Sequence, residues 1–321
     1  MKAVLCEKLG SPDDLVVREV DEPAGPGPRE VKVALAARGV AYTDVLMVAG
    51  EYQVKPELPF VVGGEGAGTV LEVGSEVEGF AAGDRVLCPG GCVERVVVDA
   101  SRITRLPEAV DFAAAAAFRA NYATALYGLQ RGRLHAGETL LVHGAAGGVG
   151  LAAVDVGKLM GATVIATAST EEKRAVAREM GADHVVDYSD GFRDQVKALT
   201  GGRGADVIYD PVGGDVFDDS MRCIAPFGRI LIVGFTSGRA AQAKTNHLLI
   251  KDAEVIGYTV GALSRHDPQW AARNARVLLG WLASGRITPY ISHRLPLERT
   301  AEALNLIRDR KVIGKAIIES R

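Results

Sequence analysis

The chain has 321 residues, a length that predicts about two domains, and 48% of them are hydrophobic against 24% charged. This composition is typical of globular proteins with a sizeable core and argues against wholesale disorder. Lys and Arg number 37 and Asp and Glu 40, for a net charge of −3, which argues against nucleic acid as the main partner. Glycine is frequent, at 38 residues, as in α/β enzymes with phosphate-binding loops.

The four cysteines are too few for a disulfide framework. The chain opens directly on a strand-like segment, without a cationic and apolar leader, and has no uncharged apolar run of about 18 residues. These features predict a soluble, reduced, cytoplasmic protein that does not enter a membrane.

The first 120 residues contain short apolar runs separated by turn-forming residues, which predicts a small antiparallel barrel or sandwich. The clearest break is the Pro- and Gly-rich stretch 22–28. The strand-like runs are residues 2–6, 15–20, 31–37, 68–73, 85–88 and 93–98.

From residue 138 onward, short β runs alternate with spacers whose apolar residues recur at helical intervals, which predicts a doubly wound parallel sheet. The strand candidates are 139–143, 163–168, 184–187, 206–210, 229–233 and 254–258. Helices are expected near 268–284 and 298–310, and a last strand, 314–319, is expected to rejoin the first domain. We predict an α/β protein in which the doubly wound domain, 122–261, is inserted into a β-rich domain of residues 1–121 and 262–321, with the site in the cleft between them.

The strongest motif is the stretch 140–150, Leu-Leu-Val-His-Gly-Ala-Ala-Gly-Gly-Val-Gly, which lies between a predicted strand and a predicted helix. Ala145, Gly147 and Gly150 match the dinucleotide fingerprint G-x-G-x-x-G, with alanine in the first place. Gly147 lets the backbone approach a pyrophosphate, Gly150 lets helix and strand pack closely, and the helix N-terminus offers N–H groups to the anion. The predicted cofactor-binding residues of this loop are Ala145, Gly147, Gly148 and Val149.

The second strand decides which dinucleotide is expected. An NAD site has a carboxylate at the end of that strand to hold the ribose 2′-hydroxyl. Here the strand ends in Thr-Ala-Ser-Thr, 167–170, without an acid, and Lys173 and Arg174 follow. Ser169 leaves room for a 2′-phosphate and Lys173 can reach it, so the sequence favours NADPH. Because two glutamates lie between them, Lys173 could instead belong to a solvated helix face.

Several motifs resemble those of medium-chain dehydrogenases/reductases: the glycine loop, Asn-Tyr-Ala-Thr-Ala at 121–125 and Gly-Gly-Glu-Gly-Ala-Gly-Thr at 63–69. Within this superfamily, essentially the whole chain resembles the zinc-free quinone oxidoreductases of the zeta-crystallin type. The resemblance implies a GroES-like catalytic domain, an NADPH-binding Rossmann domain and a homodimer or homotetramer.

Zinc alcohol dehydrogenases of the same superfamily hold a catalytic ion with a Cys-His pair, a Gly-His-Glu and a further cysteine. Here Ala-Tyr-Thr-Asp at 41–44 and Gly64-Glu65 take the first two places, and only Cys88 and Cys92 remain where a four-cysteine loop would be. We therefore predict no metal site. Without a Lewis acid, a quinone or conjugated carbonyl that is already prepared to accept hydride is favoured over an alcohol.

The predicted catalytic residues are Tyr52 and Tyr42. Tyr52 matches the position of a proton-donating tyrosine in related enoyl reductases, although it could also be a loop tyrosine that packs over the barrel. Tyr42 replaces the asparagine usual in quinone reductases and is expected to line the site. From the family and from their places after strands, the remaining cofactor-binding residues are predicted to be Thr124, Tyr188, Val233, Gly234, Phe235 and Lys315. For Thr124, Tyr188 and Lys315 a structural or solvated role stays open.

Three functions remain at this stage. The first is NADPH-dependent reduction of quinones, and the second is reduction of the C=C bond of enones, alkenals or acyl thioesters such as acryloyl-CoA, which Tyr52 favours. The third is a non-enzymatic NADPH-binding role in structure or RNA binding, which the charge balance argues against.

Overall fold

The computed structural model describes residues 1–189 and 191–320, which form two compact units. The terminal unit consists of Met1–Arg119 together with residues 288–320, and the central unit is Ala120–Ile287. The long helix α2 (Phe112–Arg131) runs from one unit into the other. Within the described residues, no helix combines the length and the apolar character needed to cross a membrane.

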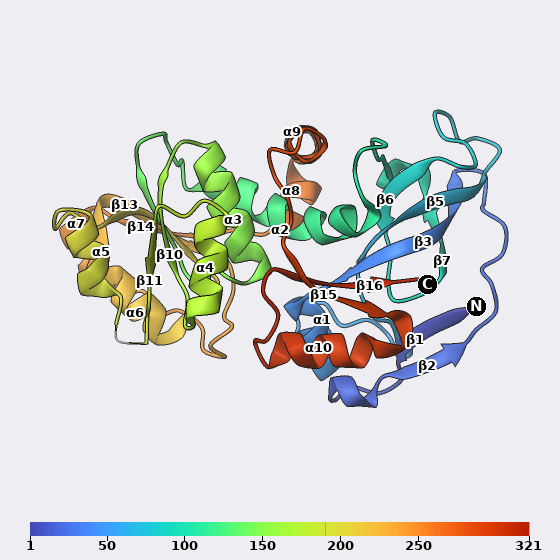
Figure 1. The fold of residues 1–321 in the computed structure, drawn as a ribbon, viewed down its shortest axis with the longest axis horizontal. Helices are drawn as coiled ribbons and strands as arrows, with labels where there is room; N and C mark the ends of the chain where they lie inside the picture. The colour runs from blue at the N-terminus through green and yellow to red at the C-terminus, as the bar shows by residue number, and fades with distance from the viewer. Residues whose placement is uncertain (190, 321) are drawn as a thin grey trace. The chain divides into compact units, whose positions relative to one another are not determined.

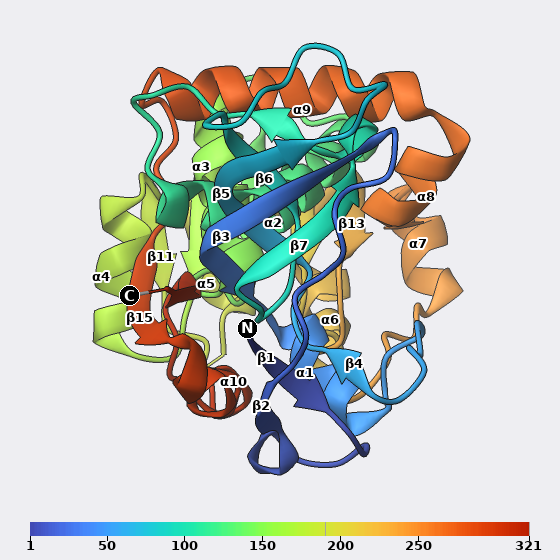
Figure 2. The same ribbon diagram turned by 90° about the vertical axis from the view of Figure 1, so that its right-hand side faces the viewer.

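The terminal unit is built mainly from antiparallel strands. They form a sheet in the order β2-β1-β4 and a larger sheet in the order β15-β16-β3-β5-β6-β8, with β7 also paired to β3. Figure 2 shows β3 with β5 and β7 beside it. The strands are β1 (Lys2–Cys6), β2 (Val16–Glu19), β3 (Glu30–Val40), β4 (Phe60–Val61), β5 (Glu65–Val73), β6 (Arg85–Pro89), β7 (Arg95–Asp99), β8 (Thr104–Arg105), β15 (Ile291–Pro296) and β16 (Lys315–Glu319).

The last strand returns to the start of the chain, as the sequence predicted. β16 pairs antiparallel with β3, from Ala316 opposite Val40 to Glu319 opposite Ala37. Helices α1 (Tyr42–Ala49) and α10 (Thr300–Arg308) share an apolar cluster with these strands, in which Val45 and Val48 of α1 and Leu304 of α10 are buried. Burial of each such side chain contributes about 1.5–3 kcal/mol to folding.

The central unit contains a six-stranded parallel sheet in the order β11-β10-β9-β12-β13-β14. The strand order reverses between β9 and β12, the point at which such sheets bind ligands beyond their carboxyl ends. Every residue of β12 is buried, as expected of a strand covered by helices on both faces. The strands are β9 (Thr139–Val142), β10 (Thr163–Thr167), β11 (His184–Val186), β12 (Ala205–Asp210), β13 (Ile224–Ile232) and β14 (Glu254–Gly257).

Helices cover both faces of this sheet. In Figure 1, α3 and α4 lie on one face and α5, α6 and α7 on the other. Leu141, Ile208 and Phe217 are among the buried residues between the sheet and this second group of helices. The helices of the unit are α3 (Gly148–Leu159), α4 (Glu171–Glu179), α5 (Arg193–Leu199), α6 (Gly214–Cys223), α7 (Thr245–Lys251), α8 (Val260–His266) and α9 (Pro268–Ala283).

One of the two unit boundaries lies near the domain boundary expected from the sequence, and the other lies farther along the chain. The first falls after Arg119, close to the predicted residue 121, whereas the second falls after Ile287 rather than residue 261. Helices α8 and α9 thus belong to the central unit. Two hydrogen bonds join α9 to α2 within this unit: the Trp270 indole N–H donates to Gln130 at 2.9 Å, and Asn274 donates to the same oxygen at 2.8 Å.

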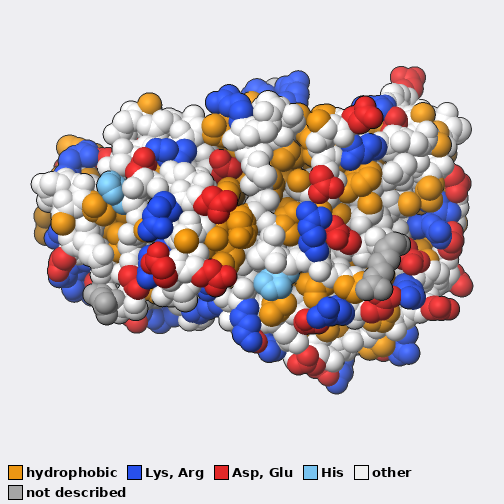
Figure 3. Space-filling view, viewed as in Figure 1, with side chains coloured by type: hydrophobic (Ala, Val, Ile, Leu, Met, Phe, Trp, Pro, Cys, Tyr) orange, Lys and Arg blue, Asp and Glu red, His pale blue; other side chains and the backbone are white. Residues whose placement is uncertain are grey.

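Charged side chains of both signs are mixed on the face shown in Figure 3. Many charged side chains of the described residues are paired, as in Arg18–Glu7 and Lys158–Asp183. This distribution agrees with the nearly balanced composition of the chain, in which 37 basic residues face 40 acidic ones.

Candidate functional site

The glycine-rich loop joins β9 to α3 at the carboxyl end of the parallel sheet. Gly144 has φ 53°, a left-handed conformation that glycine adopts without strain, and it turns the chain out of β9. Ala145 is buried, and its N–H donates to the carbonyl of Thr167 at 3.0 Å. The first fingerprint position is therefore an anchor of the loop to β10, where a small side chain is sufficient.

The remaining loop residues form the start of α3. Gly147 is the exposed N-cap residue, and Gly148 and Val149 are the half-buried first two residues of the helix. The first N–H groups of a helix have no acceptor within it and are available to an anion. A Cβ on Gly150 would lie 2.4 Å from the carbonyl oxygen of Gly144, so only glycine allows this close approach. The loop thus brings the chain tightly from β9 into the N-terminus of α3.

A buried histidine lies between the end of β9 and the glycine loop. His143 is 1% exposed, and its Nδ1 and Nε2 lie 3.1 Å from the Thr167 hydroxyl and 2.8 Å from the Ser220 hydroxyl. Burial lowers the pKa of His143 to about 3, so the ring is neutral at physiological pH. No pattern in the sequence marks His143 as part of the site, because only the folded sheet brings its two hydroxyl partners to it.

The tip of β10 is where the sequence predicts the adenosine end of a dinucleotide. Ser169 is exposed beyond the last strand residue, Thr167. Thr170 is the N-cap residue of α4, and its hydroxyl accepts a hydrogen bond from the N–H of Lys173 at 3.3 Å. Arg174 also follows this strand in the sequence, and its guanidinium bonds to Glu171, the carbonyl of Ala168 and Asp187. The strand therefore ends in small polar residues beside a helix N-terminus.

The other predicted cofactor residues of the central unit follow neighbouring strands. Tyr188 comes two residues after β11 and is half-buried, and Val233, Gly234 and Phe235 follow β13. Phe235 is 44% exposed. Because the strands are parallel, these residues lie on the same edge of the sheet as the glycine loop. Thr124 is instead placed on α2, where it is half-buried.

The two tyrosines predicted to be catalytic lie at the two ends of α1 in the terminal unit: Tyr42 begins the helix and Tyr52 follows it. Tyr42 is the first residue of the helix and packs against the apolar cluster beneath it. Gly50, with φ 74°, ends the helix, and Tyr52 follows with its N–H donating to the carbonyl of Leu46 at 3.2 Å. The Tyr52 side chain is half-buried, so its apolar ring is partly covered.

Lys315, predicted as a cofactor-binding residue, takes part in a buried charge cluster of the terminal unit. Its Nζ lies 2.9 Å from Glu65 Oε2, and the two side chains are only 4% and 11% exposed. Asp44, also buried, accepts a hydrogen bond from the N–H of Ala41 at 2.7 Å, which caps α1. Burial raises the pKa of Asp44 to about 6, and the charge of Lys315 lowers it in part. This cluster combines three ionisable groups of the barrel.

We expect Asp44→Asn to remove a pH-dependent loss of stability. In the unfolded chain Asp has a pKa of about 3.9, so the folded state binds this proton more tightly and loses stability as the pH rises from about 4 to about 6. A difference of about two between these pKa values corresponds to about 3 kcal/mol. In urea unfolding, the free energy of unfolding of the variant relative to wild type should therefore rise by that amount between pH 4 and pH 8. Asp215→Asn, at a 98% exposed position, is the control; a parallel pH dependence in wild type and Asp44→Asn would contradict the expectation.

Comparisons with known proteins agree with this architecture. Family models match residues 27–108, described as "Alcohol dehydrogenase GroES-like domain", and residues 148–276, described as "Zinc-binding dehydrogenase". A quinone oxidoreductase-like protein 2 homolog from Nematostella vectensis is 41% identical over 328 residues, which cover 100% of this chain and 89% of that protein. A quinone oxidoreductase of Pseudomonas aeruginosa is 36% identical over 99% of both chains.

The crystal structure of Escherichia coli quinone oxidoreductase complexed with NADPH matches with a TM-score of 0.91 and 29% identity, over 99% of this chain and 100% of the other. The chain belongs to the quinone oxidoreductase-like family of medium-chain dehydrogenases/reductases. It is an oxidoreductase. The predicted fold class, a GroES-like domain with an inserted Rossmann domain, is confirmed.

Because one family model is described as zinc-binding, the possible metal ligands of this oxidoreductase matter. In the part of the chain that the structure describes, no three His, Cys, Asp or Glu side chains come together as a metal site would require. Cys88 and Cys92 are both fully buried, and burial raises the pKa of each thiol to about 12. A tetrahedral zinc site needs four ligands, so these two thiols do not form one by themselves.

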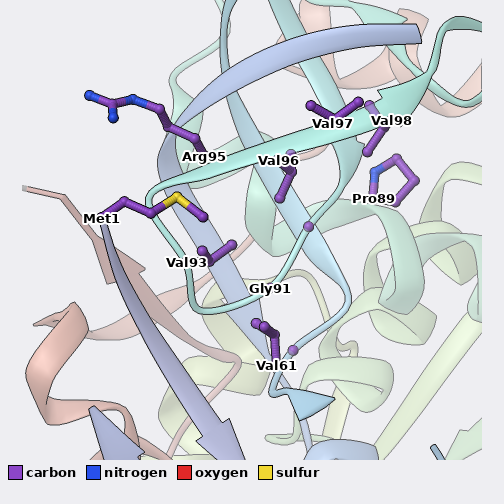
Figure 4. Close-up of a pocket in the computed structure, with 11 residues that line it drawn as sticks. Met1, Val61, Pro89, Gly91, Val93, Arg95, Val96, Val97 and Val98 are labelled. Carbon is purple, nitrogen blue, oxygen red and sulfur yellow. The ribbon is translucent and has the colours of Figure 1, made fainter. Parts of the chain in front are cut away.

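The terminal unit also has an apolar groove of about 370 Å³. Figure 4 shows Val61 of β4, together with Val93 and Val96 near the start of β7, around one space, with Arg95 at its edge. The sequence-predicted site residues are not part of its lining, which consists of Met1, Val61, Gly63, Pro89, Gly90, Gly91, Val93, Arg95, Val96, Val97 and Val98. The groove is thus a feature separate from the tyrosines around α1.

Proposed function

We propose that this oxidoreductase uses NADPH to reduce quinones without a metal ion. The observation that carries the cofactor assignment is the tip of β10, where Ser169 is exposed and the residues 167–170 include no acid to hold a ribose 2′-hydroxyl. The NADPH complex of the Escherichia coli relative supports the same choice. Lys173, in the first turn of α4, is the proposed cation for the 2′-phosphate.

The central unit supplies the proposed contacts to the rest of the coenzyme. The N–H groups of Gly148 and Val149 would bind the pyrophosphate, with Gly147 and Ala145 allowing its approach. Tyr188 would cover the adenosine phosphate end. The nicotinamide ring, which supplies the hydride when bound, would be held by residues of the strand and helix ends, namely Thr124, Val233, Gly234 and Phe235.

Lys315 is proposed to act on the site indirectly, through its pair with Glu65, without contacting the coenzyme. Its ammonium pairs with Glu65 at 2.9 Å, and the pair is buried. A cation held in this way stabilises the carboxylate and orders the surrounding backbone rather than reaching for a phosphate. We therefore propose that Lys315 is a positioning residue of the barrel.

In the proposed reaction, the chain's own task is to orient the acceptor and provide a proton. Quinones accept hydride without a Lewis acid because the incoming charge is delocalised onto a distant oxygen. The phenol of Tyr52 is the proposed proton donor, and the ring of Tyr42 the proposed wall beside it. The same phenol could protonate the product of C=C reduction, so an enone or enoyl reductase is the second candidate.

Metal independence has its own test. Its support is that Cys88 and Cys92 supply only two thiols, and that no three His, Cys, Asp or Glu side chains of the described residues gather as a metal site would require. We expect prolonged incubation with EDTA or 1,10-phenanthroline to leave the rate of NADPH oxidation within about 20% of the untreated rate. Elemental analysis should find less than about 0.1 zinc per chain. A rate lost on chelation and restored by zinc would contradict the proposal.

The acceptor is tested with a panel of 1,4-benzoquinone, 9,10-phenanthrenequinone, crotonaldehyde and acryloyl-CoA. We expect NADPH oxidation to be fastest with a quinone. Tyr52→Phe should slow C=C reduction about 100-fold and quinone turnover less than about three-fold, because the hydroquinone anion that hydride transfer forms is readily protonated by water. Tyr290→Phe, which removes another half-buried phenol of the same unit, is the control. Faster turnover of crotonaldehyde or acryloyl-CoA would instead assign the second candidate, and no oxidation with any acceptor would refute both.

A further inference from the structure

Arg174 and Asp187 form an ion pair beside the tip of β10. Arg174 belongs to α4, and Asp187 is the residue that follows β11. Arg174 Nη1 lies 2.6 Å from Asp187 Oδ2, and the two side chains are 15% and 34% exposed. Because β10 and β11 are adjacent parallel strands, the pair links the helix that follows β10 to the end of β11, at the edge of the sheet that carries the glycine loop.

Further acceptors hold the guanidinium of Arg174 in place. Its Nη1 also donates to the carbonyl of Ala168 at 3.1 Å, and its Nε donates to Glu171 Oε2 at 3.1 Å. Ala168 immediately precedes Ser169, the residue proposed to lie at the coenzyme's ribose. A side chain with these bonds would have to break them to reach a ligand, so Arg174 acts from a fixed position.

Asp187 carries a negative charge at neutral pH. It accepts hydrogen bonds from the hydroxyl and the N–H of Ser189, the latter at 2.9 Å, and these bonds together with the charge of Arg174 lower its pKa. Asp187 also directly precedes Tyr188, proposed to cover the adenosine end. A fixed carboxylate thus lies beside the proposed 2′-phosphate site. Such a charge repels a phosphate, whereas it can accept a hydrogen bond from a 2′-hydroxyl.

We propose that the Arg174–Asp187 pair determines whether this site accepts a 2′-phosphate. Arg174 neutralises Asp187 and keeps its carboxylate turned away from the ribose, and without Arg174 the site would favour coenzymes with a 2′-hydroxyl. The inference rests on the proposed NADPH site and adds two residues to it: Arg174 as a positioning residue and Asp187 as the charge that it offsets.

The alternative is that Arg174 binds the phosphate directly, and a double-mutant cycle separates the two roles. Isothermal titration calorimetry on the full chain would use 2′,5′-ADP, which carries the 2′-phosphate, and 5′-AMP, which does not. The variants are Arg174→Gln, Asp187→Asn and the double variant. Asparagine keeps the oxygen that accepts from Ser189, so Asp187→Asn preserves the local turn.

We expect Arg174→Gln to weaken binding of 2′,5′-ADP about ten-fold and binding of 5′-AMP less than about three-fold. Asp187→Asn should strengthen binding of 2′,5′-ADP about three-fold, because the positive charge of Arg174 is then no longer offset. The double variant should return to within about three-fold of wild type, since both charges are gone. These three results together would support the proposal.

Two outcomes would overturn it: a double variant that binds 2′,5′-ADP as weakly as Arg174→Gln, or an Asp187→Asn variant without any gain. Arg178→Gln makes the same charge change on the same helix, at a 56% exposed side chain, and should alter either affinity less than about two-fold. If wild type binds neither 2′,5′-ADP nor NADPH, or if Lys173→Ala leaves both affinities unchanged, the proposed NADPH site itself fails. Melting temperatures of all variants show whether each is folded.

Discussion

Replacing Gly150 by alanine is expected to lower the free energy of unfolding of the central unit by about 2–3 kcal/mol and to weaken NADPH binding more than about 100-fold. The new Cβ would lie 2.4 Å from the carbonyl oxygen of Gly144 and 2.7 Å from Cα of Ala145. Both neighbours are backbone atoms of the glycine loop, so relief of the overlap must move the loop or the helix α3. Either movement displaces the N–H groups proposed to bind the pyrophosphate.

The control is Gly280→Ala. Gly280 lies within α9 at an exposed position, and a Cβ there would meet no atom within 4 Å. Alanine in a helix is about 0.5–1 kcal/mol more favourable than glycine, so this variant should be as stable as wild type or more stable. Urea unfolding gives the stability, and quenching of Trp fluorescence on addition of NADPH gives the affinity. A Gly150→Ala variant with wild-type values for both would show that the loop is not held by this close approach.

Local patterns predicted most of the fold. The strand runs of both units and the return of the last strand follow from short apolar segments between turn-forming residues. A different case is β13, which starts at Ile224 although the expected run starts at residue 229. Residues 225–228 contain proline and glycine, and Phe227 has φ 60°, so the sequence reads as a turn. A register shift between Ala205 and Val207 lets β12 keep pairing with this segment.

Local patterns could not predict α1 or the second unit boundary. Helix α1 has the sequence Tyr-Thr-Asp-Val-Leu-Met-Val-Ala, and its start depends on the bond from the Ala41 N–H to Asp44. The unit that ends at Ile287 contains hydrogen bonds from Trp270 and Asn274 to Gln130, 140 and 144 residues earlier in the chain. Contacts of this kind exist only once the chain is folded.

The candidate site, like the fold, has parts that local sequence predicts and parts that only the folded chain brings together. The glycine loop and the end of β10 are continuous in sequence, and their chemistry follows from residue type and order. Ion pairs behave differently: Glu65 and Lys315 are 250 residues apart, and Arg174 meets Asp187 only because β10 and β11 are neighbours. The sequence therefore indicated where an anion would bind, while the charges that surround these positions required the structure.

Lys315→Met is expected to lower the free energy of unfolding by about 3–5 kcal/mol. The substitution matches the alkyl part of the lysine side chain but removes the ammonium that lies 2.9 Å from Glu65 Oε2. Because both side chains are almost completely buried, the carboxylate would lose its cation without gaining water. Chemical unfolding at pH 8 measures the loss. Arg18→Met, at an exposed ion pair with Glu7, should cost less than about 1 kcal/mol.

The double variant Lys315→Met, Glu65→Gln tests the cause of that loss. With both charges removed, the penalty of a buried carboxylate disappears, so most of the stability should return. Asp44 provides an independent readout. Lys315 lowers the pKa of Asp44 and Glu65 raises it, so Lys315→Met alone should move the titration of Asp44 from about 6 to higher pH, and the double variant should move it back in part. If the double variant were as unstable as Lys315→Met, the lysine would act through packing of its alkyl chain against Gly39 rather than through its charge.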